Sequence, residues 1–230
     1  MLPCFCKDGF VTVFDPKRKR NARGEQRQQD LLRAAALVFG RLGYHETTTN
    51  AIALEAGVSP ATLYQFFPNK EAIASALAST YAREMAEAER SIDPEGKLDF
   101  TTAVTELIDL CISFNQERPE FHSLVVDAPL TPSAREDKKK LGQAFVDFIA
   151  DRLQKELRGL SRPEAHHHGQ VALMVFRGIL DELTIASPQA RARLQQAMRT
   201  AILRYLTPVL FEEGRPVVAR KSRKGEDRTR

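Results

Sequence analysis

The chain has 230 residues, 43% of them apolar, and its 34 lysines and arginines exceed its 30 aspartates and glutamates by a net charge of +4. This length and apolar content suit one small domain joined to a larger one, and they exclude a chain that is disordered throughout. No run approaches the roughly 18 apolar residues of a membrane span, and charged residues stand where a signal peptide has an apolar block. We therefore expect a cytoplasmic protein that binds no membrane.

Basic residues crowd the first 25 positions, which we expect to form a disordered leader. No apolar period is present there to hold the segment against a core. A basic arm that contacts DNA phosphates is the alternative that the same charges allow. The charges include Lys17, Arg18, Lys19, Arg20 and Arg23.

An amphipathic helix is predicted over residues 26–42. Apolar side chains recur there at helical spacing, and Gly43 follows as a stop signal. A helix with one apolar face can close a three-helix core with the two helices that follow. The apolar positions are Leu31, Ala35, Val38, Phe39 and Leu42.

The stretch from residue 47 to residue 70 predicts two short capped helices around a tight turn. Thr48 or Thr49 can cap the first helix, and Gly57 can take the left-handed conformation that ends it. Ser59 can cap the second, with Pro60 at its first position. This is a helix-turn-helix, although an ordinary αα-corner in a helical domain has the same signals.

The second of these helices has an outward face that suits a DNA major groove. On a helical wheel it buries Leu63 and Phe67. Small or hydrogen-bonding side chains on the other sides can approach base edges, and the helix dipole favours nearby phosphates. The outward and flanking positions are Ala61, Thr62, Tyr64 and Gln65.

Residues 26–75 resemble, without a gap, the DNA-binding domain of the TetR family of transcriptional regulators. The resemblance implies that Thr49 holds a phosphate and Asn50 reaches a base, while residues 60–62 face base edges and Tyr64 and Lys70 hold the backbone. The residues that carry the resemblance are Gly43-Tyr44, the threonines 47–49, Ala56-Gly57-Val58-Ser59, Leu63-Tyr64, Phe67 and Lys70-Glu71. The predicted DNA-binding residues are Thr48, Thr49, Asn50, Ser59, Pro60, Ala61, Thr62, Tyr64, Gln65 and Lys70.

One position departs from that family's pattern. Phe66 stands where the family usually has Tyr or His, so it lacks a polar tip that could bond a phosphate. Phe66 is the one feature that favours a small-molecule-binding protein with weak or lost DNA binding as the alternative function.

The remainder of the chain is predicted to be helical, which makes the fold all-α. The expected helices span 70–91, 98–117, 119–126, 133–158, 163–186 and 188–212. We expect a helix-turn-helix domain over 26–72, a helical bundle for ligand binding and dimerisation over 73–212, and a basic disordered tail over 213–230.

The resemblance implies that the bundle holds a pocket for a small effector. An aromatic-rich lining favours an apolar or amphipathic ligand, although each of these residues has a plain core role as its alternative. The predicted pocket residues are Leu107, Cys111, Phe114, Phe145, Phe148 and Phe176.

A homodimer is expected because a head of about fifty residues reads too few bases alone, whereas two copies read two half-sites. As in the resembled family, the last two helices would pair with their mates across a twofold axis, or else merely complete the bundle. The predicted interface residues are Val175, Ile179, Leu194, Met198, Ile202 and Tyr205.

Several other clusters are interpreted as having no chemical role. Residues 166–168 are histidines, but neighbouring helical side chains point about 100° apart and do not converge on a metal. Cys4 and Cys6 do not complete a tetrahedral metal site, and with Cys111 they form no disulfide framework. Residues 138–140, all lysines, are interpreted as a solvated face. No catalytic motif is present, so we expect neither an enzyme nor a cofactor.

The sequence therefore predicts a homodimeric transcriptional regulator, in the first instance a repressor. It would bind a palindromic DNA operator and be released by a small, apolar effector.

Overall fold

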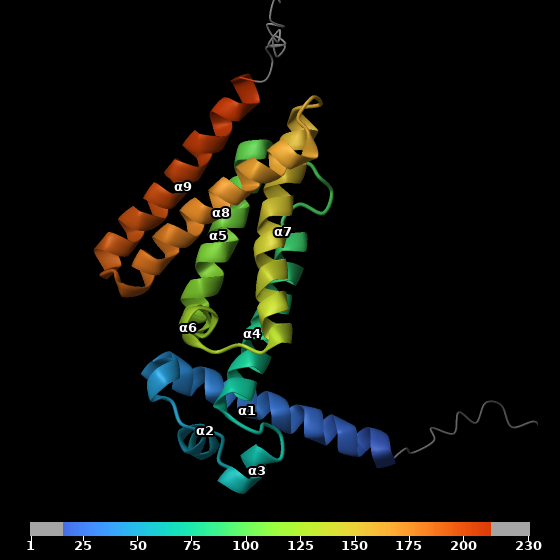
Figure 1. Cartoon of the computed structure of the whole chain (residues 1–230), viewed down its shortest axis with the longest axis vertical. Helices are drawn as coiled ribbons and strands as arrows, with labels where there is room; N and C mark the ends of the chain where they lie inside the picture. Colours follow the sequence, from blue (N-terminus) through green and yellow to red (C-terminus); the bar gives the residue numbers. More distant parts are fainter. Residues whose placement is uncertain (1–15, 213–230) are drawn as a thin grey trace, which may run out of the picture.

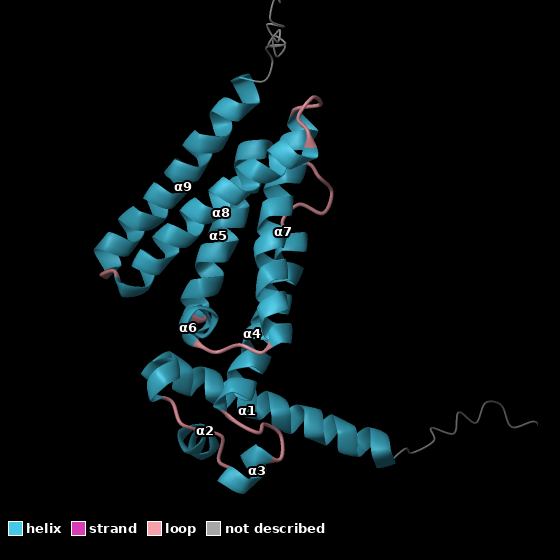
Figure 2. Cartoon of the chain, in the orientation of Figure 1, coloured by secondary structure: helices cyan, strands magenta, loops and turns pink. Residues whose placement is uncertain are grey.

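The computed structural model describes residues 16–212, and every regular element in that range is a helix, which confirms the predicted all-α fold (Figure 1, Figure 2). Residues 1–15, with Cys4 and Cys6, and the basic tail 213–230 lie outside the described residues. The helices are α1 (Pro16–Glu46), α2 (Thr49–Glu55), α3 (Pro60–Tyr64), α4 (Lys70–Arg90), α5 (Phe100–Glu117), α6 (Pro119–Asp127), α7 (Pro132–Glu156), α8 (Arg162–Ile185) and α9 (Pro188–Glu212).

The first helix is longer than predicted. It begins at Pro16, so residues 16–25 are helical, and their assignment to a disordered leader was wrong. Proline suits the first turn of a helix because its missing N–H has no partner there. Lysine, arginine, glutamine and glutamate are good helix formers, so a helix can continue through them without an apolar stripe.

Gly43 interrupts α1 three residues before the end of the helix. Its φ of 73° is outside the helical range, as expected for a stop signal. Leu42 was predicted on the buried face, but it is 46% exposed. Tyr44 takes the buried place instead, because its ring stacks on Phe39 with centroids 6.0 Å apart.

Helix α4 connects the small head of α1, α2 and α3 to the larger body (Figure 1). Asn69 caps the helix by accepting a hydrogen bond from the Ala72 amide at 2.8 Å. Its first turns bury Ile73 in the head, and Tyr81 and Met85 belong to the body. Because α4 packs in both parts, a shift of the body would also move the head.

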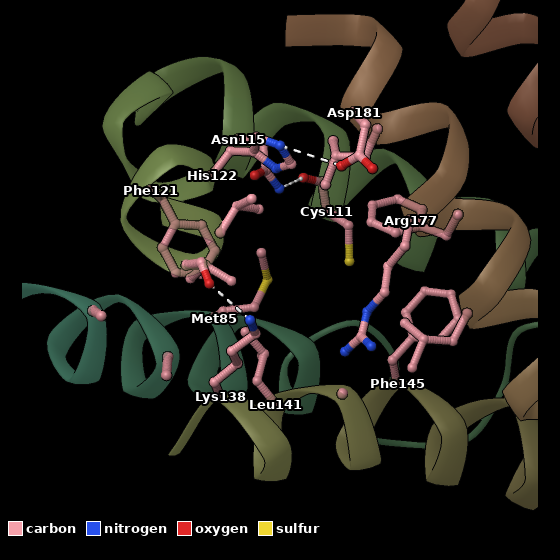
Figure 3. Close-up of a pocket in the computed structure, with 18 of the residues that line it drawn as sticks. Met85, Cys111, Asn115, Phe121, His122, Lys138, Leu141, Phe145, Arg177 and Asp181 are labelled. Atoms are coloured by element: carbon pink, nitrogen blue, oxygen red, sulfur yellow. Dashed lines mark hydrogen bonds and ion pairs between the residues drawn. The ribbon is translucent and has the colours of Figure 1, made fainter. Parts of the chain in front are cut away.

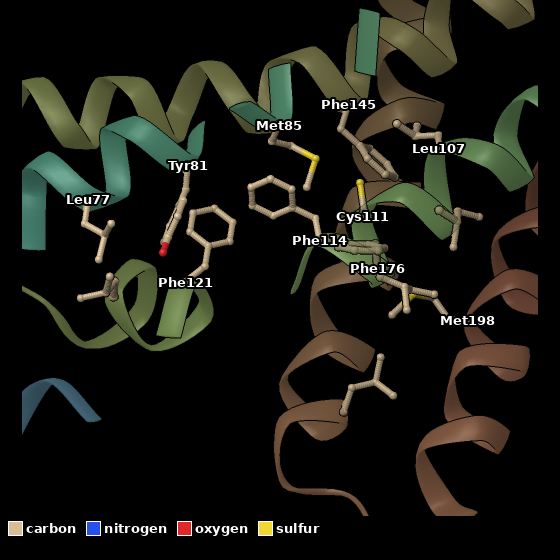
Figure 4. Packing of buried hydrophobic residues seen from close by; sticks show 14 of the residues in the cluster. Leu77, Tyr81, Met85, Leu107, Cys111, Phe114, Phe121, Phe145, Phe176 and Met198 are labelled. Carbon is tan, nitrogen blue, oxygen red and sulfur yellow. The ribbon is translucent and has the colours of Figure 1, made fainter. Parts of the chain in front are cut away.

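Aromatic side chains fill the body where α4, α5 and α6 meet (Figure 4). Tyr81, Phe114 and Phe121 form an edge-to-face trio with centroids 5.5 to 6.2 Å apart. The Tyr81 hydroxyl donates to the buried carboxylate of Glu120 at the start of α6. Because α6 also packs against α1, this cluster joins body and head.

Helices α7 and α8 come very close at Gly169, where a Cβ would lie 2.7 Å from the Val146 carbonyl oxygen. We expect Gly169→Ala to destabilise the protein by about 1 to 3 kcal/mol, because the helix backbones must separate. Gly24→Ala on α1 is the control, since no atom lies within 4 Å of its Cβ position, and it should be neutral or slightly stabilising. Urea unfolding at one protein concentration measures both, and equal midpoints would contradict the expectation.

Candidate functional site

The helix-turn-helix is built from the caps that the sequence predicts. The Thr48 hydroxyl accepts from the Ala51 amide at 3.1 Å, and the Ser59 hydroxyl accepts from the Thr62 amide at 3.1 Å. Gly57 turns the chain with a φ of 63°. These three features set the angle between α2 and α3.

The buried and exposed sides of α3 are those that the helical wheel predicts. Leu63 and Phe67 are buried, whereas Ala61 and Gln65 are exposed and Tyr64 is 50% exposed. The outward face is therefore small and polar, with a single aromatic ring at its edge. Such a surface fits a major groove without steric conflict.

Tyr64 and Thr49 are brought together across the turn. The phenol oxygen of Tyr64 lies 2.9 Å from Oγ1 of Thr49, within hydrogen-bond distance. Asn50, the next residue of α2, is exposed beside them. Three side chains from two helices thus share one edge of the head.

Lys70 is already engaged inside the head. Its ammonium donates to the carbonyl oxygens of Tyr44 at 2.8 Å and His45 at 3.1 Å, and it lies 4.4 Å from the centroid of the Tyr44 ring. A cation at the end of α1 satisfies carbonyls that the helix leaves free. Lys70 therefore orders the start of α4, a role that its place in the motif does not suggest.

Phe66 packs, half-buried, against the core of the head. The ring thus has a structural role that needs no polar tip.

The body contains a cavity of about 280 Å³ that is partly open to solvent, between α4, α5, α6, α7 and α8 (Figure 3). Of the predicted pocket residues, Cys111, Phe145 and Phe176 line it. The other three do not, and their assignment was wrong: Leu107 and Phe114 are buried in the core, and Phe148 lies under Arg152. The apolar stripe of α5 is broad, so its sequence does not say which side meets the cavity.

Charged residues of the cavity were missed by the sequence analysis. Glu89, Lys138 and Arg177 line it together with apolar side chains of α4 and α6 such as Met85 and Phe121. Lys138 therefore does not belong to a solvated face, although Lys139 and Lys140 are exposed as predicted. The sequence did contain one sign of a charged residue at the cavity, because Glu89 lies at helical spacing on the same side of α4 as its apolar residues.

Glu89 is 6% exposed, and burial raises its pKa from the ordinary 4.5 to about 7, opposed only partly by the charge of Arg90. Between these values the folded protein holds a proton that the unfolded chain has lost, so stability falls as the pH rises. We expect wild type to lose about 3 kcal/mol relative to Glu89→Gln between pH 4.5 and 7, and no more above pH 8. Urea unfolding across this range measures the difference, and a constant difference would contradict the assignment.

Two predicted interface residues lie inside the subunit. Met198 and Ile202 have no exposed surface, because this face of α9 packs against the rest of the body, so their assignment to a dimer surface was wrong. Val175, Ile179, Leu194 and Tyr205 are half-buried. The apolar pattern of α9 covers more than one side, and packing on α5 and α8 decides which side is internal.

No helix within residues 16–212 is long and apolar enough to cross a membrane. In the same range no group of three or more His, Cys, Asp or Glu side chains is placed to hold a metal ion. His168 instead lies 2.9 Å from the Tyr205 hydroxyl through its Nδ1 atom.

The head and the body each match a known protein family. Residues 31–77 match the family described as bacterial regulatory proteins, tetR family, and residues 99–206 match the tetracyclin repressor-like C-terminal domain. The chain belongs to the TetR family of transcriptional regulators. It is a DNA-binding regulator with an N-terminal helix-turn-helix domain, in a family of regulators rather than enzymes.

Individual relatives are distant. The chain is 23% identical to the HTH-type transcriptional regulator UidR of Escherichia coli strain K12 over 204 residues, which are 87% of this chain and 98% of that protein. A TetR-family regulator from Streptomyces coelicolor has the same fold with a TM-score of 0.61 at 20% identity, covering 80% of this chain and 99% of the other. A Rhodococcus regulator gives a TM-score of 0.64 at 18% identity, covering 79% and 96%. At these identities the structures establish the TetR fold and no more.

Proposed function

We propose that this TetR-family protein is a repressor that binds a palindromic operator as a homodimer and dissociates when a small molecule fills the body cavity. The observation that carries the proposal is that α6 lines the cavity through Phe121 and also packs against α1 of the head. One short helix thus touches both the effector site and the DNA-reading domain.

The head would contact DNA through the edge formed by α2 and α3. Thr49 and Tyr64 suit phosphate oxygens, because both hydroxyls are at the surface edge of the head. Asn50 suits an adenine edge, to which an amide bonds bidentately. Pro60, Ala61 and Thr62 begin α3, where their small side chains can approach base edges in the major groove. Ser59 and Thr48 act as caps, and Lys70 contributes mainly by ordering α4.

The dimer would form through the outer faces of α8 and α9, without Met198 and Ile202, which are buried inside the subunit. Met174 and Ile185 on α8 and Phe211 on α9 are large apolar side chains with 70%, 81% and 78% of their surface exposed. Ala197 and Ala201 are exposed on α9, and small residues let helix backbones approach closely. A twofold axis on this surface would pair each face with its own copy.

Release would follow from a population shift. The two heads must be about 34 to 36 Å apart to reach successive major grooves. An effector that prefers a body conformation with another spacing weakens DNA binding, and DNA then weakens effector binding by the same factor. Glu120 of α6, bonded to Tyr81 of α4, is placed to pass such a change to α1.

The experiment that tests the repressor is a gel shift of the full-length protein on the intergenic DNA upstream of its own gene. We expect a complex at nanomolar protein that an excess of unrelated DNA does not remove. Binding no tighter than to unrelated DNA would favour the alternative, a small-molecule-binding protein that has lost operator recognition.

Asn50→Ala tests base reading. If the amide of Asn50 reads one base pair, the variant should lose about 1 to 3 kcal/mol of discrimination at that pair and little at others. Fluorescence anisotropy with the operator and its single-base variants measures this. Equal losses on all sequences would make Asn50 a backbone contact instead.

A further inference from the structure

Two cationic side chains converge on the cavity from neighbouring helices. Lys138 of α7 donates to the Val125 carbonyl oxygen at 2.7 Å, and Arg177 of α8 points its guanidinium into the cavity (Figure 3). The pKa of Lys138 is lowered first by burial and then by the charge of Arg177. The two cations therefore share one end of the cavity and repel each other.

No acid in the described part of the chain neutralises this pair. Within residues 16–212 no carboxylate lies within 4.0 Å of the ammonium of Lys138 or the guanidinium of Arg177 in an ion pair. Asp181 also lines the cavity, but its carboxylate lies 3.3 Å from His122 Nε2. Lys138 is half-buried, whereas Arg177 is exposed although it lines the cavity. Cations that line a cavity without an acid partner favour an anionic ligand.

The place of the guanidinium depends on a glycine. A Cβ at Gly142 would lie 2.6 Å from Nη2 of Arg177, so the guanidinium occupies the space that a side chain would fill. Gly142 is buried on α7, four residues beyond Lys138. This close approach holds the two cations on the same side of the cavity.

The other end of the cavity carries Glu89. Helices α4 and α7 lie side by side in parallel, since Ser75 bonds Thr131 at one end and Asp93 bonds Arg152 at the other. This register places Glu89 level with the part of α7 that lies about seven to ten residues after Lys138, or about 10 to 15 Å along the helix. Within the described chain the carboxyl of Glu89 makes no hydrogen bond to another side chain or to the backbone.

Between these two ends the lining is apolar, with Met85, Phe121, Phe145 and Phe176 as its main side chains. The cavity volume of about 280 Å³ is close to that of nine liquid waters, which suits a ligand of about a dozen heavy atoms. The ligand therefore meets two cations, an apolar middle and a hydrogen-bonding carboxyl in that order.

The geometry points to an amphipathic monocarboxylate as the ligand, with its carboxylate on Lys138 and Arg177 and a hydroxyl group on Glu89. A carboxylate matches the planar fork of the guanidinium, and one negative charge is what a small, mainly apolar cavity can accept. The inference rests on the proposed function only in taking this cavity as the effector site.

The test uses 3-(4-hydroxyphenyl)propionate, its methyl ester and 3-phenylpropionate, each titrated into the full-length protein by calorimetry. We expect the acid to bind at least tenfold more tightly than the ester, because charge-assisted hydrogen bonds are lost in the ester. It should also bind several-fold more tightly than 3-phenylpropionate, which lacks the hydroxyl.

Variants separate the two ends of the cavity. Arg177→Gln should weaken the acid at least tenfold and leave the ester unchanged, and Gly142→Ala should act in the same direction by displacing the guanidinium. Lys138→Gln should also weaken the acid and leave the ester unchanged. Lys140→Gln is its matched control, since Lys140 is exposed on the same helix outside the cavity. Glu89→Leu should remove the preference for the hydroxyl and keep the preference for the carboxylate.

The inference is overturned if none of the three compounds binds, if acid and ester bind equally, or if the difference persists in Arg177→Gln. Fluorescence anisotropy of the operator complex gives a separate readout. An acid that binds with the expected preferences but leaves the operator complex intact would support the ligand class and contradict the proposed release mechanism.

Discussion

Ala201→Glu is expected to yield a folded monomer with operator affinity lower by about a thousandfold or more. Ala201 is exposed on the outer face of α9, where the proposed twofold axis would place two new carboxylates without cationic partners. A monomer has a single head, which keeps the phosphate contacts of only one half-site. Its affinity should fall towards that of nonspecific binding, which is at least about a thousandfold weaker than specific binding. Light scattering gives the mass, and anisotropy gives the affinity.

The neighbouring residue supplies the control. Ile202 has no exposed surface, so Ile202→Glu puts its charge into the core of the subunit itself and is expected to unfold the protein. By circular dichroism, Ala201→Glu should therefore keep the helical signal and Ile202→Glu should lose it, although both add the same charge. An intact dimer in the Ala201→Glu protein would place the interface elsewhere.

Tyr64→Ala is expected to weaken operator binding by at least about a hundredfold while leaving the thermal transition within a few degrees of wild type. The side chain is half exposed, so the fold depends little on it. A hydrogen bond to a charged phosphate contributes about 1.5 to 3 kcal/mol, and a dimer loses two of them. Anisotropy on the operator and a thermal melt measure the two effects.

Tyr64→Phe isolates the hydroxyl, because it keeps the ring and removes only the oxygen that lies 2.9 Å from Thr49. If the phenol binds a phosphate, the phenylalanine variant should lose most of what the alanine variant loses. Wild-type affinity in both variants would remove Tyr64 from the DNA contact.

Local signals in the sequence predicted most of the helices of this protein, although α1 begins ten residues before the predicted start at residue 26. Thr48, Ser59 and Asn69 are caps whose bonds reach only three residues ahead, and Gly57 is a turn residue whose conformation depends on its own backbone. The apolar spacing of Leu63 in α3 and Phe67 just after it likewise predicts one buried side. Such features involve neighbours in the chain, so their pattern is visible without the fold.

The residues of the cavity and of the subunit surface were decided only by tertiary packing. Helices α5 and α9 are apolar on more than one side, and their neighbours determine that Phe114 and Ile202 are core while Cys111 meets the cavity. The placement of Lys138, Arg177 and Glu89 around one cavity depends on how α7 and α8 pack against α4, which is distant from both in the chain. Periodicity states which residues share a face, but burial depends on the helix that covers that face, and that is a property of the whole fold.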